Sequence, residues 1–308
     1  MTANGEPQAF LNGHFVPQSA AVVSVSDAGF VQGTTVAEQL RTFGGKLFRL
    51  DEHLARLERS LEIIGVRLDI SLVELGEIAR ELARRNHALL EPGDDLNLAM
   101  FVTPGPYPAM APPGERLPTV CLHTVPLPFY LWADKYGVGE SLATTDIPQT
   151  APECWPVELK CRSRMHYYLA DQQARQRYPG ARAVMLDAQG YVTEATTANL
   201  AIYRQGVGVL APPREKVLPG ISLAVLRELA TRCSLTWNEQ DLKPSDLASA
   251  DEVWLASTSV CMLPVTSFNG RPIADGRPGT WFAELIGRWS DLAKLDVISQ
   301  SRKFAIRG

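Results

Sequence analysis

The stretch TTVAEQLRTFGGKLFRLDEHLARLERSLEIIGV, residues 34–66, decides the fold, because its periodicity changes from that of a sheet to that of a helix. Its first half, 34–50, predicts two strands around the glycine pair 44–45, since glycine favours turns between strands. Its second half, 51–66, predicts a helix with Asp51 as the N-cap. The helical spacing of this half is carried by Leu54, Leu57, Leu61 and Ile64.

The rest of the chain repeats this mixture of strands and helices. A hairpin is expected over 9–27, where the turn NGHF divides alternating apolar residues. A long loop at 104–116, rich in proline and glycine, interrupts the regular pattern. Further strands are predicted at 95–103, 117–127, 182–213 and 250–270, and further helices at 71–86, 163–177, 218–233 and 279–295, the last of which is expected to close the chain.

These elements indicate an α+β fold in two domains. A length of 308 residues is enough for two sizeable cores. We place a small N-terminal domain at 1–127, an interdomain connector at 128–137 and a larger domain at 138–308.

Composition and charge exclude several classes of partner. Hydrophobic residues make up 45% and charged residues 21% of the chain, as in globular proteins. A net charge of −4 without any basic run argues against nucleic acid, and no apolar stretch is long enough to span a membrane. The N-terminus MTANGEPQAF lacks the features of a signal peptide, so we expect a cytoplasmic protein.

The cysteines predict neither a disulfide framework nor a metal centre. Their number is odd, they are scattered, and no CxxC pair occurs. We therefore expect reduced thiols and no metal site. Cys161 stands out only because it follows Lys160. The five are Cys121, Cys154, Cys161, Cys233 and Cys261.

Two residues have the chemistry of a site for a carbonyl compound. Lys160 is the single lysine of WPVELKCRSRMHYYLADQQARQ (155–176) and lies between an extended run and a helix. A lysine in an apolar pocket forms Schiff bases, although most lysines lie at the surface. Glu194 interrupts a strand beside Thr196 and Asn199. It is either an acid that pairs with a cationic ring nitrogen or a solvated strand end.

Two further segments and an arginine have the chemistry of a phosphate site. Gly220, Ile221 and Ser222 lie where a loop enters a helix, and helix N-termini attract anions. By itself Ser222 is more simply an N-cap. The turn ASTSV (256–260) is rich in hydroxyl groups, which in most turns satisfy the turn's own backbone. Arg56 in HLARLERS is also compatible with a charge lying over an apolar helix face.

In their order along the chain these segments resemble the class IV, or fold-type IV, pyridoxal-phosphate enzymes. That family includes branched-chain and D-amino-acid aminotransferases, R-selective amine transaminases and aminodeoxychorismate lyases. The resemblance covers about residues 10–293 and implies a small N-terminal α/β sandwich domain and a larger domain with a β-barrel-like sheet. Six ordered blocks carry it: LNGHFV, SVSDAGFVQGTTVAEQLRTFGGKLFRLDEHLARLERS, ELKCRSRMHYYLA, VMLDAQGYVTEATTANLAIY, LPGISLAVLREL and DEVWLASTSVCMLPVTSFNGRPI.

The resemblance implies pyridoxal 5′-phosphate as the cofactor and gives roles to the residues above. Lys160 matches the lysine that forms a Schiff base with the cofactor and then moves a proton between substrate and cofactor. Glu194 matches the carboxylate that pairs with the pyridine nitrogen, and Arg56 matches the arginine that binds the phosphate. The remaining cofactor contacts are expected from Thr196, Asn199, Gly220, Ile221, Ser222, Ser257 and Thr258.

The resemblance also bears on substrate choice. GTTVAEQLR resembles the branched-chain pattern, with Arg41 in place, but Ala37 stands where the family has Tyr or Phe, which enlarges the pocket. Met165 occupies the position of a tyrosine that contacts the cofactor in branched-chain enzymes. In the loop 104–116 only Arg116 is basic, so the carboxylate trap of D-amino-acid enzymes is missing or replaced. Candidate substrate contacts are Ala37, Arg41, Asn97, Tyr107, Arg164 and Ser259, with Arg162 as a further cation.

The leading hypothesis is a transaminase that moves an amino group between an amino acid or amine and a 2-oxo acid by a ping-pong mechanism. The first alternative is a 4-amino-4-deoxychorismate lyase, which forms 4-aminobenzoate and pyruvate; the segment KCRSRM (160–165) resembles the lyase pattern. The second alternative is a homologue that binds the cofactor without turnover. The resemblance further implies a homodimer in which the loop 104–116 is lent to the partner's site.

Overall fold

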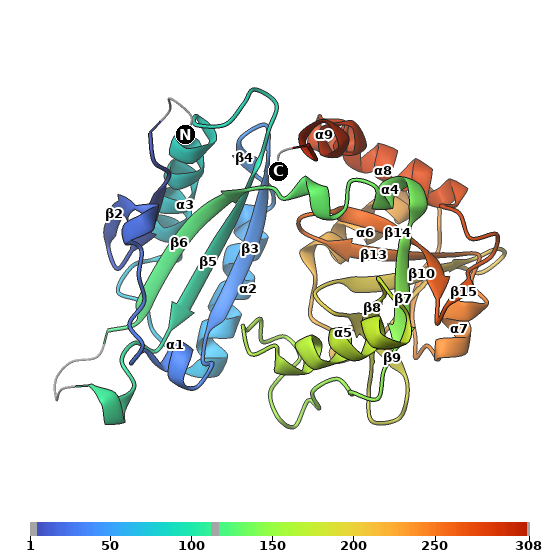
Figure 1. The fold of residues 1–308 in the computed structure, drawn as a ribbon, viewed down its shortest axis with the longest axis horizontal. Helices are drawn as coiled ribbons and strands as arrows, with labels where there is room; N and C mark the ends of the chain where they lie inside the picture. The colour runs from blue at the N-terminus through green and yellow to red at the C-terminus, as the bar shows by residue number, and fades with distance from the viewer. Residues whose placement is uncertain (1–4, 112–116, 307–308) are drawn as a thin grey trace. The chain divides into compact units, whose positions relative to one another are not determined.

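The predicted strands and helices assemble into two units, each with its own sheet and helices (Figure 1). The computed structural model describes residues 5–111 and 117–306. Both units combine a sheet with helices, which confirms the predicted α+β class. Unit 1 contains the described residues up to Leu127 together with Leu159–Ser163, and unit 2 contains Pro128–Glu158 and the described residues from Arg164 onward.

Unit 1 is built on an antiparallel sheet. Its strands are β1 (Gln8–Leu11), β2 (His14–Pro17), β3 (Val36–Phe43), β4 (Lys46–Leu47), β5 (Leu96–Thr103) and β6 (Thr119–Pro126). Their order in the sheet is β2-β1-β6-β5-β3-β4. The first hairpin turns at Asn12 and Gly13, which both have positive φ, as a two-residue hairpin turn requires. The hairpin is shorter than the predicted 9–27, because a 3-10 turn at Gln18–Ala20 follows β2.

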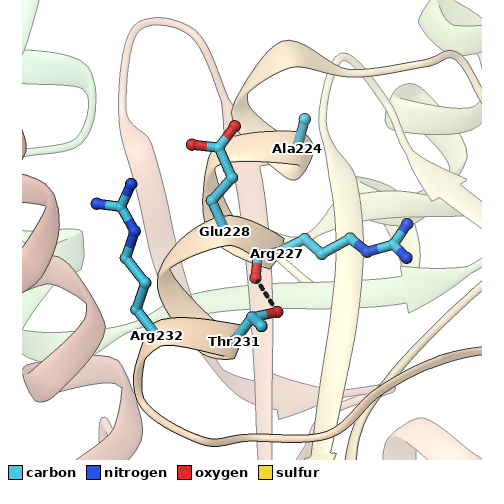
Figure 2. Close-up of a pocket in the computed structure, with 5 residues that line it drawn as sticks. All are labelled: Ala224, Arg227, Glu228, Thr231 and Arg232. Atoms are coloured by element: carbon cyan, nitrogen blue, oxygen red, sulfur yellow. Dashed lines mark hydrogen bonds between the residues drawn. The ribbon is translucent and has the colours of Figure 1, made fainter.

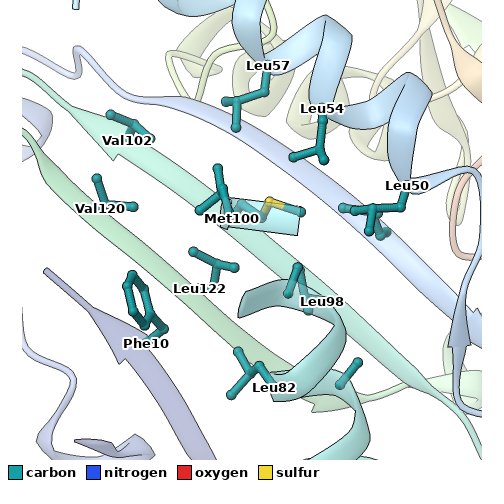
Figure 3. Packing of buried hydrophobic residues seen from close by; sticks show 14 of the residues in the cluster. Phe10, Leu50, Leu54, Leu57, Leu82, Leu98, Met100, Val102, Val120 and Leu122 are labelled. Carbon is teal, nitrogen blue, oxygen red and sulfur yellow. The ribbon is translucent and has the colours of Figure 1, made fainter. Parts of the chain in front are cut away.

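Two helices, α2 (Leu50–Ile64) and α3 (Leu72–His87), cover one face of this sheet (Figure 1). Their leucines pack against even-numbered residues of β3, β5 and β6, such as Leu40 of β3. Figure 3 shows Met100 of β5 and Leu122 of β6 in this layer. Burying one aliphatic side chain of this size contributes about 1.5–3 kcal/mol, so this layer holds the unit together. The buried helix positions include Leu54, Leu57 and Leu61, which the sequence pattern predicted.

The start of α2 differs from the prediction. Arg49 occupies the N-cap position in a left-handed conformation (φ 54°), and Asp51 is an exposed residue of the first turn. The prediction of Asp51 as the N-cap is therefore wrong. A carboxylate in the first turn still interacts favourably with the helix dipole, which explains why the sequence signal is similar.

The other face of the unit 1 sheet carries three candidate substrate residues. Because side chains alternate along a strand, the odd-numbered positions of β3 and β5 point away from the helices. Ala37 is paired with Phe101, and Arg41 is paired with Asn97. The candidates Ala37, Arg41 and Asn97 therefore share one face of the sheet.

Unit 2 contains a mixed sheet that curls on itself. Its strands are β7 (Glu140–Thr144), β8 (Arg182–Leu186), β9 (Val192–Ala195), β10 (Asn199–Arg204), β11 (Gly208–Ala211), β12 (Trp237–Glu239), β13 (Glu252–Ser257), β14 (Cys261–Phe268) and β15 (Arg271–Pro272). The main path runs β12-β11-β10-β13-β14-β7-β8-β9, with β15 beside β14. A bridge between Ala195 and Ala198 brings β9 back beside β10, so the sheet is barrel-like, as expected.

The helices of unit 2 are α4 (Lys135–Val138), α5 (Met165–Arg177), α6 (Ile221–Arg232), α7 (Pro244–Ala248), α8 (Thr280–Ala293) and α9 (Val297–Phe304). Helix α5 packs on β7 and β8, whereas α6 and α8 pack on β13 and β14. The helix predicted at 279–295 is not the last one, because Lys294 ends α8 in a left-handed conformation and Asp296 caps α9. Eight residues are too few to show a helical period, so the sequence pattern does not reveal α9.

Three general expectations concern membranes, metals and thiols. None of the helices in the described ranges is both long and apolar enough to cross a bilayer. Nor do the described residues gather three His, Cys, Asp or Glu side chains where they could hold a metal ion. The cysteines are free thiols, and burial raises the pKa of Cys121 to about 11, which makes it unreactive.

Truncating a core side chain of unit 1 should destabilise the protein strongly. Leu82 on α3 is fully buried, so Leu82→Ala is expected to lower the free energy of unfolding by about 2–5 kcal/mol. Val73 on the same helix is 77% exposed, and Val73→Ala should change it by less than about 0.5 kcal/mol. Urea unfolding followed by circular dichroism measures both variants. Equal losses of unfolding free energy in the two variants would contradict the orientation of α3.

Candidate active site

Lys160 lies on a short segment that is added to the edge of β3 in unit 1. The N–H of Ala37 donates to the carbonyl oxygen of Lys160 (2.9 Å), and the N–H of Arg162 donates to that of Thr35 (2.8 Å). The N–H of Lys160 donates to Oγ of the buried Ser60 on α2 (3.2 Å). Three hydrogen bonds thus fix the backbone around a partly buried lysine.

A buried carboxylate, Glu38 on β3, joins Arg56 and His53 of α2. Arg56 binds it through two parallel hydrogen bonds, from Nε to Oε1 (2.7 Å) and from Nη2 to Oε2 (2.8 Å). His53 Nδ1 lies 2.7 Å from Oε2 of the same carboxylate. Glu38 is 1% exposed and His53 is 2% exposed, so each needs its partner in the interior. The two-point contact fixes the plane of the Arg56 guanidinium.

The electrostatics of this cluster keep Glu38 charged and His53 neutral. Burial by itself would raise the pKa of Glu38, but Arg56, His53 and the charge of Lys160 together bring that pKa down to about 2. Burial lowers the pKa of His53 against the opposing effect of Glu38. A neutral His53 beside an ionised carboxylate donates from Nδ1, which defines its tautomer. Glu38 therefore interacts with both candidate cations of unit 1, Arg56 and Lys160.

On the other face of the sheet, Ala37, Arg41 and Asn97 are buried. Arg41 Nε donates to the carbonyl oxygen of Thr42 (3.3 Å), and its guanidinium lies 4.1 Å from the centre of the Phe43 ring. Asn97 is 7% exposed, and its Oδ1 has no hydrogen-bond partner among the residues that the structure describes. A buried acceptor without a donor is costly, so this oxygen has unused hydrogen-bonding capacity.

The other substrate candidates lie outside the strands. Tyr107 is partly buried at the start of a 3-10 turn, and its N–H donates to the carbonyl oxygen of Ser26 (2.7 Å). In unit 2, Arg164 occupies the N-cap position of α5 and Ser259 lies in the turn after β13. Arg116 lies outside the described residues.

In unit 2, Glu194 is a buried residue of β9 and not a solvated strand end. Its Oε1 accepts hydrogen bonds from the hydroxyl of Tyr167 (2.6 Å) and from Nε2 of Gln149 (3.0 Å). Its Oε2 accepts one from Nδ2 of Asn199 (3.2 Å). Hydrogen bonds of this kind favour the ionised form, so these donors hold a charged carboxylate in one orientation.

The start of α6 packs against the same asparagine. Asn199 Nδ2 also donates to the carbonyl oxygen of Leu218 (3.0 Å), and a Cβ at Gly220 would overlap Asn199 Oδ1, so glycine is required there. Gly220 takes the N-cap position, and Ser222 is a buried residue of the first turn instead. The N–H groups of Ile221 and Ser222 belong to the four at a helix start without an intrahelical acceptor, which suits an anion.

The hydroxyl-bearing residues of unit 2 fall into two groups. Ser257 and Thr258 are partly buried at the turn between β13 and β14, which the pairing of Ser257 with Cys261 closes. Thr196 is buried, and its Oγ1 donates to Oδ1 of Asp171 on α5 (2.8 Å). The Thr196 hydroxyl therefore joins two elements of the fold.

Within each unit the structure gathers part of the predicted set. Arg56 binds the Glu38 carboxylate of unit 1 and the charge of Lys160 acts on the same group, and Glu194, Asn199 and Gly220 come together in unit 2. Four residues without a predicted role complete these clusters: Glu38, His53, Gln149 and Tyr167.

A sequence signal existed for two of these four residues. Glu38 is a charged residue at a core-facing position of a strand, and such a residue needs a buried partner. His53 precedes Arg56 by three residues on one helix, which places both on the same face. Gln149, which lies in a loop, and Tyr167, which follows a helix start, give no comparable signal.

A shallow surface hollow of about 480 Å³ lies on α6 (Figure 2). Its lining comes from one helix face, where Thr231 Oγ1 donates back to the carbonyl oxygen of Arg227 (2.8 Å). None of the candidate residues lines it, so it is separate from the candidate site. The lining residues are Ala224, Arg227, Glu228, Thr231 and Arg232.

Comparisons with known proteins show the family of this chain. Residues 35–268 match the family model described as amino-transferase class IV. A D-alanine aminotransferase of Bacillus licheniformis is 31% identical over 269 residues, which cover 87% of this chain and 90% of that protein. The crystal structure of the Escherichia coli branched-chain amino acid aminotransferase aligns with a TM-score of 0.84 at 26% identity, over 94% of this chain and 95% of that one. The branched-chain amino acid aminotransferase of Thermobaculum terrenum, solved in its PLP form, shares the fold with a TM-score of 0.81 at 20% identity, over 98% of this chain and 97% of that one.

Removing the Glu38 charge should destabilise the protein in a pH-dependent way. Because the pKa of Glu38 falls from 4.5 to about 2 on folding, the ionised group stabilises the fold above pH 4.5, and this contribution is lost as the pH falls toward 2. Glu38→Gln should therefore cost about 3 kcal/mol at pH 7, where it leaves Arg56 without its buried partner, and much less at pH 3. Urea midpoints at pH 7, 5 and 3 measure the difference.

Glu81→Gln is the matched control. Glu81 also binds two arginines, Arg84 and Arg85, but does so in solvent on α3, where screening weakens the pairs. Its substitution should have little effect at any of these pH values. If the difference in stability between the wild type and Glu38→Gln is the same at pH 7 and pH 3, the assignment of the charge to Glu38 is refuted.

Proposed function

The chain belongs to the class IV aminotransferases, and from this premise we propose that it transfers an amino group between an amino acid or amine and a 2-oxo acid with pyridoxal 5′-phosphate as cofactor. The reaction has two halves in a ping-pong order: the donor leaves as its oxo compound, and a 2-oxo acid then takes the amino group. The observation that carries the proposal is the family match over 35–268, which includes every candidate cofactor residue.

The donor groups of this chain fit that cofactor. The Arg56 guanidinium, the N-terminus of α6 and the hydroxyls of Ser257 and Thr258 suit a phosphate. The hydrogen-bonded carboxylate of Glu194 suits a protonated ring nitrogen. When bound, pyridoxal phosphate supplies a carbonyl carbon that takes the substrate amine and a ring that accepts electrons from the substrate Cα.

Each proposed role uses a group that the fold holds in place. The Lys160 amine would hold the cofactor covalently in the resting protein, and after the substrate amine has displaced it, the free amine would hold and move the proton at the substrate Cα. Arg56 binds the phosphate with a guanidinium whose plane Glu38 sets. Glu194 keeps a proton at the ring nitrogen, and Asn199 orients Glu194.

The substrate is proposed to lie against the face of the unit 1 sheet that carries Ala37, Arg41 and Asn97. The small Ala37 leaves room for a substrate side chain, and Oδ1 of Asn97, which has no donor among the described residues, accepts a hydrogen bond from a substrate N–H or O–H group. Arg41 supplies positive charge on the same face. Further substrate contacts are proposed for Tyr107, Arg164 and Ser259.

A homodimer is also proposed, and exposed apolar side chains of unit 1 support it. The segment 22–30 lies beside the start of the loop 104–116, because Asp27 and Pro106 form a bridge. Large apolar side chains gathered in this way on a surface mark a contact with another protein. The most exposed of them are Val22, Val25, Phe30 and Met110, at 72%, 79%, 74% and 62%.

Single amines, added without an oxo acid, test the transaminase proposal. The protein is loaded with pyridoxal phosphate and mixed in turn with L-leucine, L-glutamate, D-alanine and R-1-phenylethylamine. We expect one of them to abolish the absorbance of the lysine-bound cofactor and to release one equivalent of its oxo product, because the first half-reaction needs no acceptor. Borohydride reduction and mass spectrometry should place the cofactor on Lys160, and Lys160→Ala should abolish this attachment.

Two other outcomes would replace the transaminase. Release of pyruvate from 4-amino-4-deoxychorismate, with no amine changing the spectrum, would establish the lyase that the segment KCRSRM resembles. A cofactor attached to Lys160 that responds to no amine and to no aminodeoxychorismate would indicate a homologue without turnover.

The dimer is tested by light scattering coupled to size exclusion. The molar mass should be twice the 33.8 kDa of one chain. Phe30→Ser combined with Val25→Ser should shift it toward the monomer, because both substitutions place hydroxyls in an apolar contact. Val73→Ser is the control, since Val73 is equally exposed elsewhere on unit 1. A wild-type monomer that turns over fully would refute the proposal.

A further inference from the structure

Two neighbouring tyrosines on α5 have opposite surroundings. Ala170 and Ala174 of this helix are fully buried on its inner side. Tyr167, one turn before Ala170, packs against the same alanine-rich cluster. Tyr168 is 62% exposed. The phase of the helix therefore directs Tyr167 inward and Tyr168 outward. The inward tyrosine brings its hydroxyl to Oε1 of Glu194, at 2.6 Å.

The amide of Gln149 completes a network around this contact. An ionised carboxylate only accepts hydrogen bonds, so Gln149 directs Nε2 toward Glu194 (3.0 Å), and its Oε1 then accepts from Nε2 of His166 (3.1 Å). Gln149 Nε2 also lies 3.3 Å from the Tyr167 oxygen. The Tyr167 oxygen thus accepts from Gln149 while its proton goes to Glu194.

The Tyr167 hydroxyl is a strong and permanent donor. A distance of 2.6 Å lies in the range of hydrogen bonds from a hydroxyl to an ionised oxygen. Burial, and then the charge of Glu194, raise the pKa of Tyr167, so the hydroxyl keeps its proton. Oε1 of Glu194 therefore accepts from both Tyr167 and Gln149, while Asn199 donates to Oε2.

The helix that carries Tyr167 is itself anchored one turn later. Asp171 accepts hydrogen bonds from the N–H of Ala183 on β8 (3.0 Å) and from the hydroxyl of Thr196 (2.8 Å). Asp171 follows Tyr167 by four residues and so lies on the same side of α5. These contacts hold the Tyr167 ring at a fixed distance from the strand that carries Glu194.

We propose that Tyr167, with Gln149, is a positioning residue that holds the Glu194 carboxylate ionised and correctly oriented to pair with the protonated ring nitrogen of the cofactor. The inference rests on the proposed function, and Tyr167 acts through Glu194. Without the Tyr167 hydroxyl, Oε1 loses its shortest hydrogen bond, so the carboxylate rotates more freely and carries its charge less favourably.

Binding of two ligands separates this role from a structural one. The dissociation constants of pyridoxal phosphate and of its analogue with a carbon in place of the ring nitrogen are measured by fluorescence titration of the cofactor-free protein. Both ligands carry the same aldehyde and phosphate. Tyr167→Phe should weaken the binding of pyridoxal phosphate by about tenfold and the binding of the analogue by less than about twofold, because only pyridoxal phosphate has a ring nitrogen for Glu194 to bind.

Further variants make the result specific. Tyr168→Phe changes the exposed neighbour and should leave both dissociation constants unchanged. Gln149→Met keeps a side chain of similar length but removes a second hydrogen-bond donor to Oε1. It should weaken the binding of pyridoxal phosphate selectively, as Tyr167→Phe does. Thermal unfolding of each variant shows whether it is folded, and the Gln149 variant decides the matter if Tyr167→Phe is not.

Glu194→Gln distinguishes failure of the inference from failure of the proposed function. It should abolish the preference of the wild type for pyridoxal phosphate over the analogue. If Glu194→Gln abolishes this preference, and Tyr167→Phe weakens the binding of both ligands equally or of neither, the positioning role is refuted and the proposed function stands. If the wild type has no such preference, or Glu194→Gln retains it, Glu194 does not pair with the ring nitrogen. The positioning role of Tyr167 and the function proposed for Glu194 are then both overturned.

Discussion

A carboxylate in a protein interior must have partners for its charge, and Glu38 imposes this constraint on unit 1. It sits on the core-facing side of β3 among leucines, where an unpaired charge would be intolerable. Arg56 and His53 of α2 satisfy it, so the helix is held to the strand by directed hydrogen bonds as well as by apolar packing. The segment of Lys160 is hydrogen-bonded to the same strand, which ties both proposed cofactor-binding cations of this unit to one β-strand.

Unit 2 solves a similar problem with neutral donors. Glu194 is also buried, and a tyrosine, a glutamine and an asparagine donate hydrogen bonds to it. Neutral donors stabilise the negative charge without cancelling it, which leaves the carboxylate able to attract a cation. The difference between the two carboxylates therefore matches their proposed roles: Glu38 neutralises a cation that already belongs to the protein, and Glu194 keeps its charge for the cofactor.

A tight turn and a helix phase assemble the surroundings of Glu194. Thr197 takes a left-handed conformation (φ 64°) in the turn that the Ala195–Ala198 bridge closes, and this turn returns Asn199 to Glu194 from the neighbouring strand. On α5, Met165 is 70% exposed and faces outward. Two residues later the helix presents Tyr167 inward to the carboxylate.

The sequence by itself determined the elements and the chemical groups of this protein. Alternating and helical periods predicted the strands β3, β5 and β6 and the helices α2 and α3, because burial of one face leaves a periodic record. The ordered motifs around Arg56, Lys160, Glu194 and Ser222 identified the family, since each motif brings a reactive group together with its local backbone.

Tertiary structure decided the partners of those groups. Glu38, His53, Gln149 and Tyr167 come from different elements, and nothing in a local pattern states which of them will meet. Asp51 was misassigned as an N-cap because cap and first-turn carboxylates interact alike with a helix dipole, and only the conformation of Arg49 distinguishes them. Sequence periodicity records which side chains are buried, whereas hydrogen bonds between distant residues depend on how strands and helices pack in three dimensions.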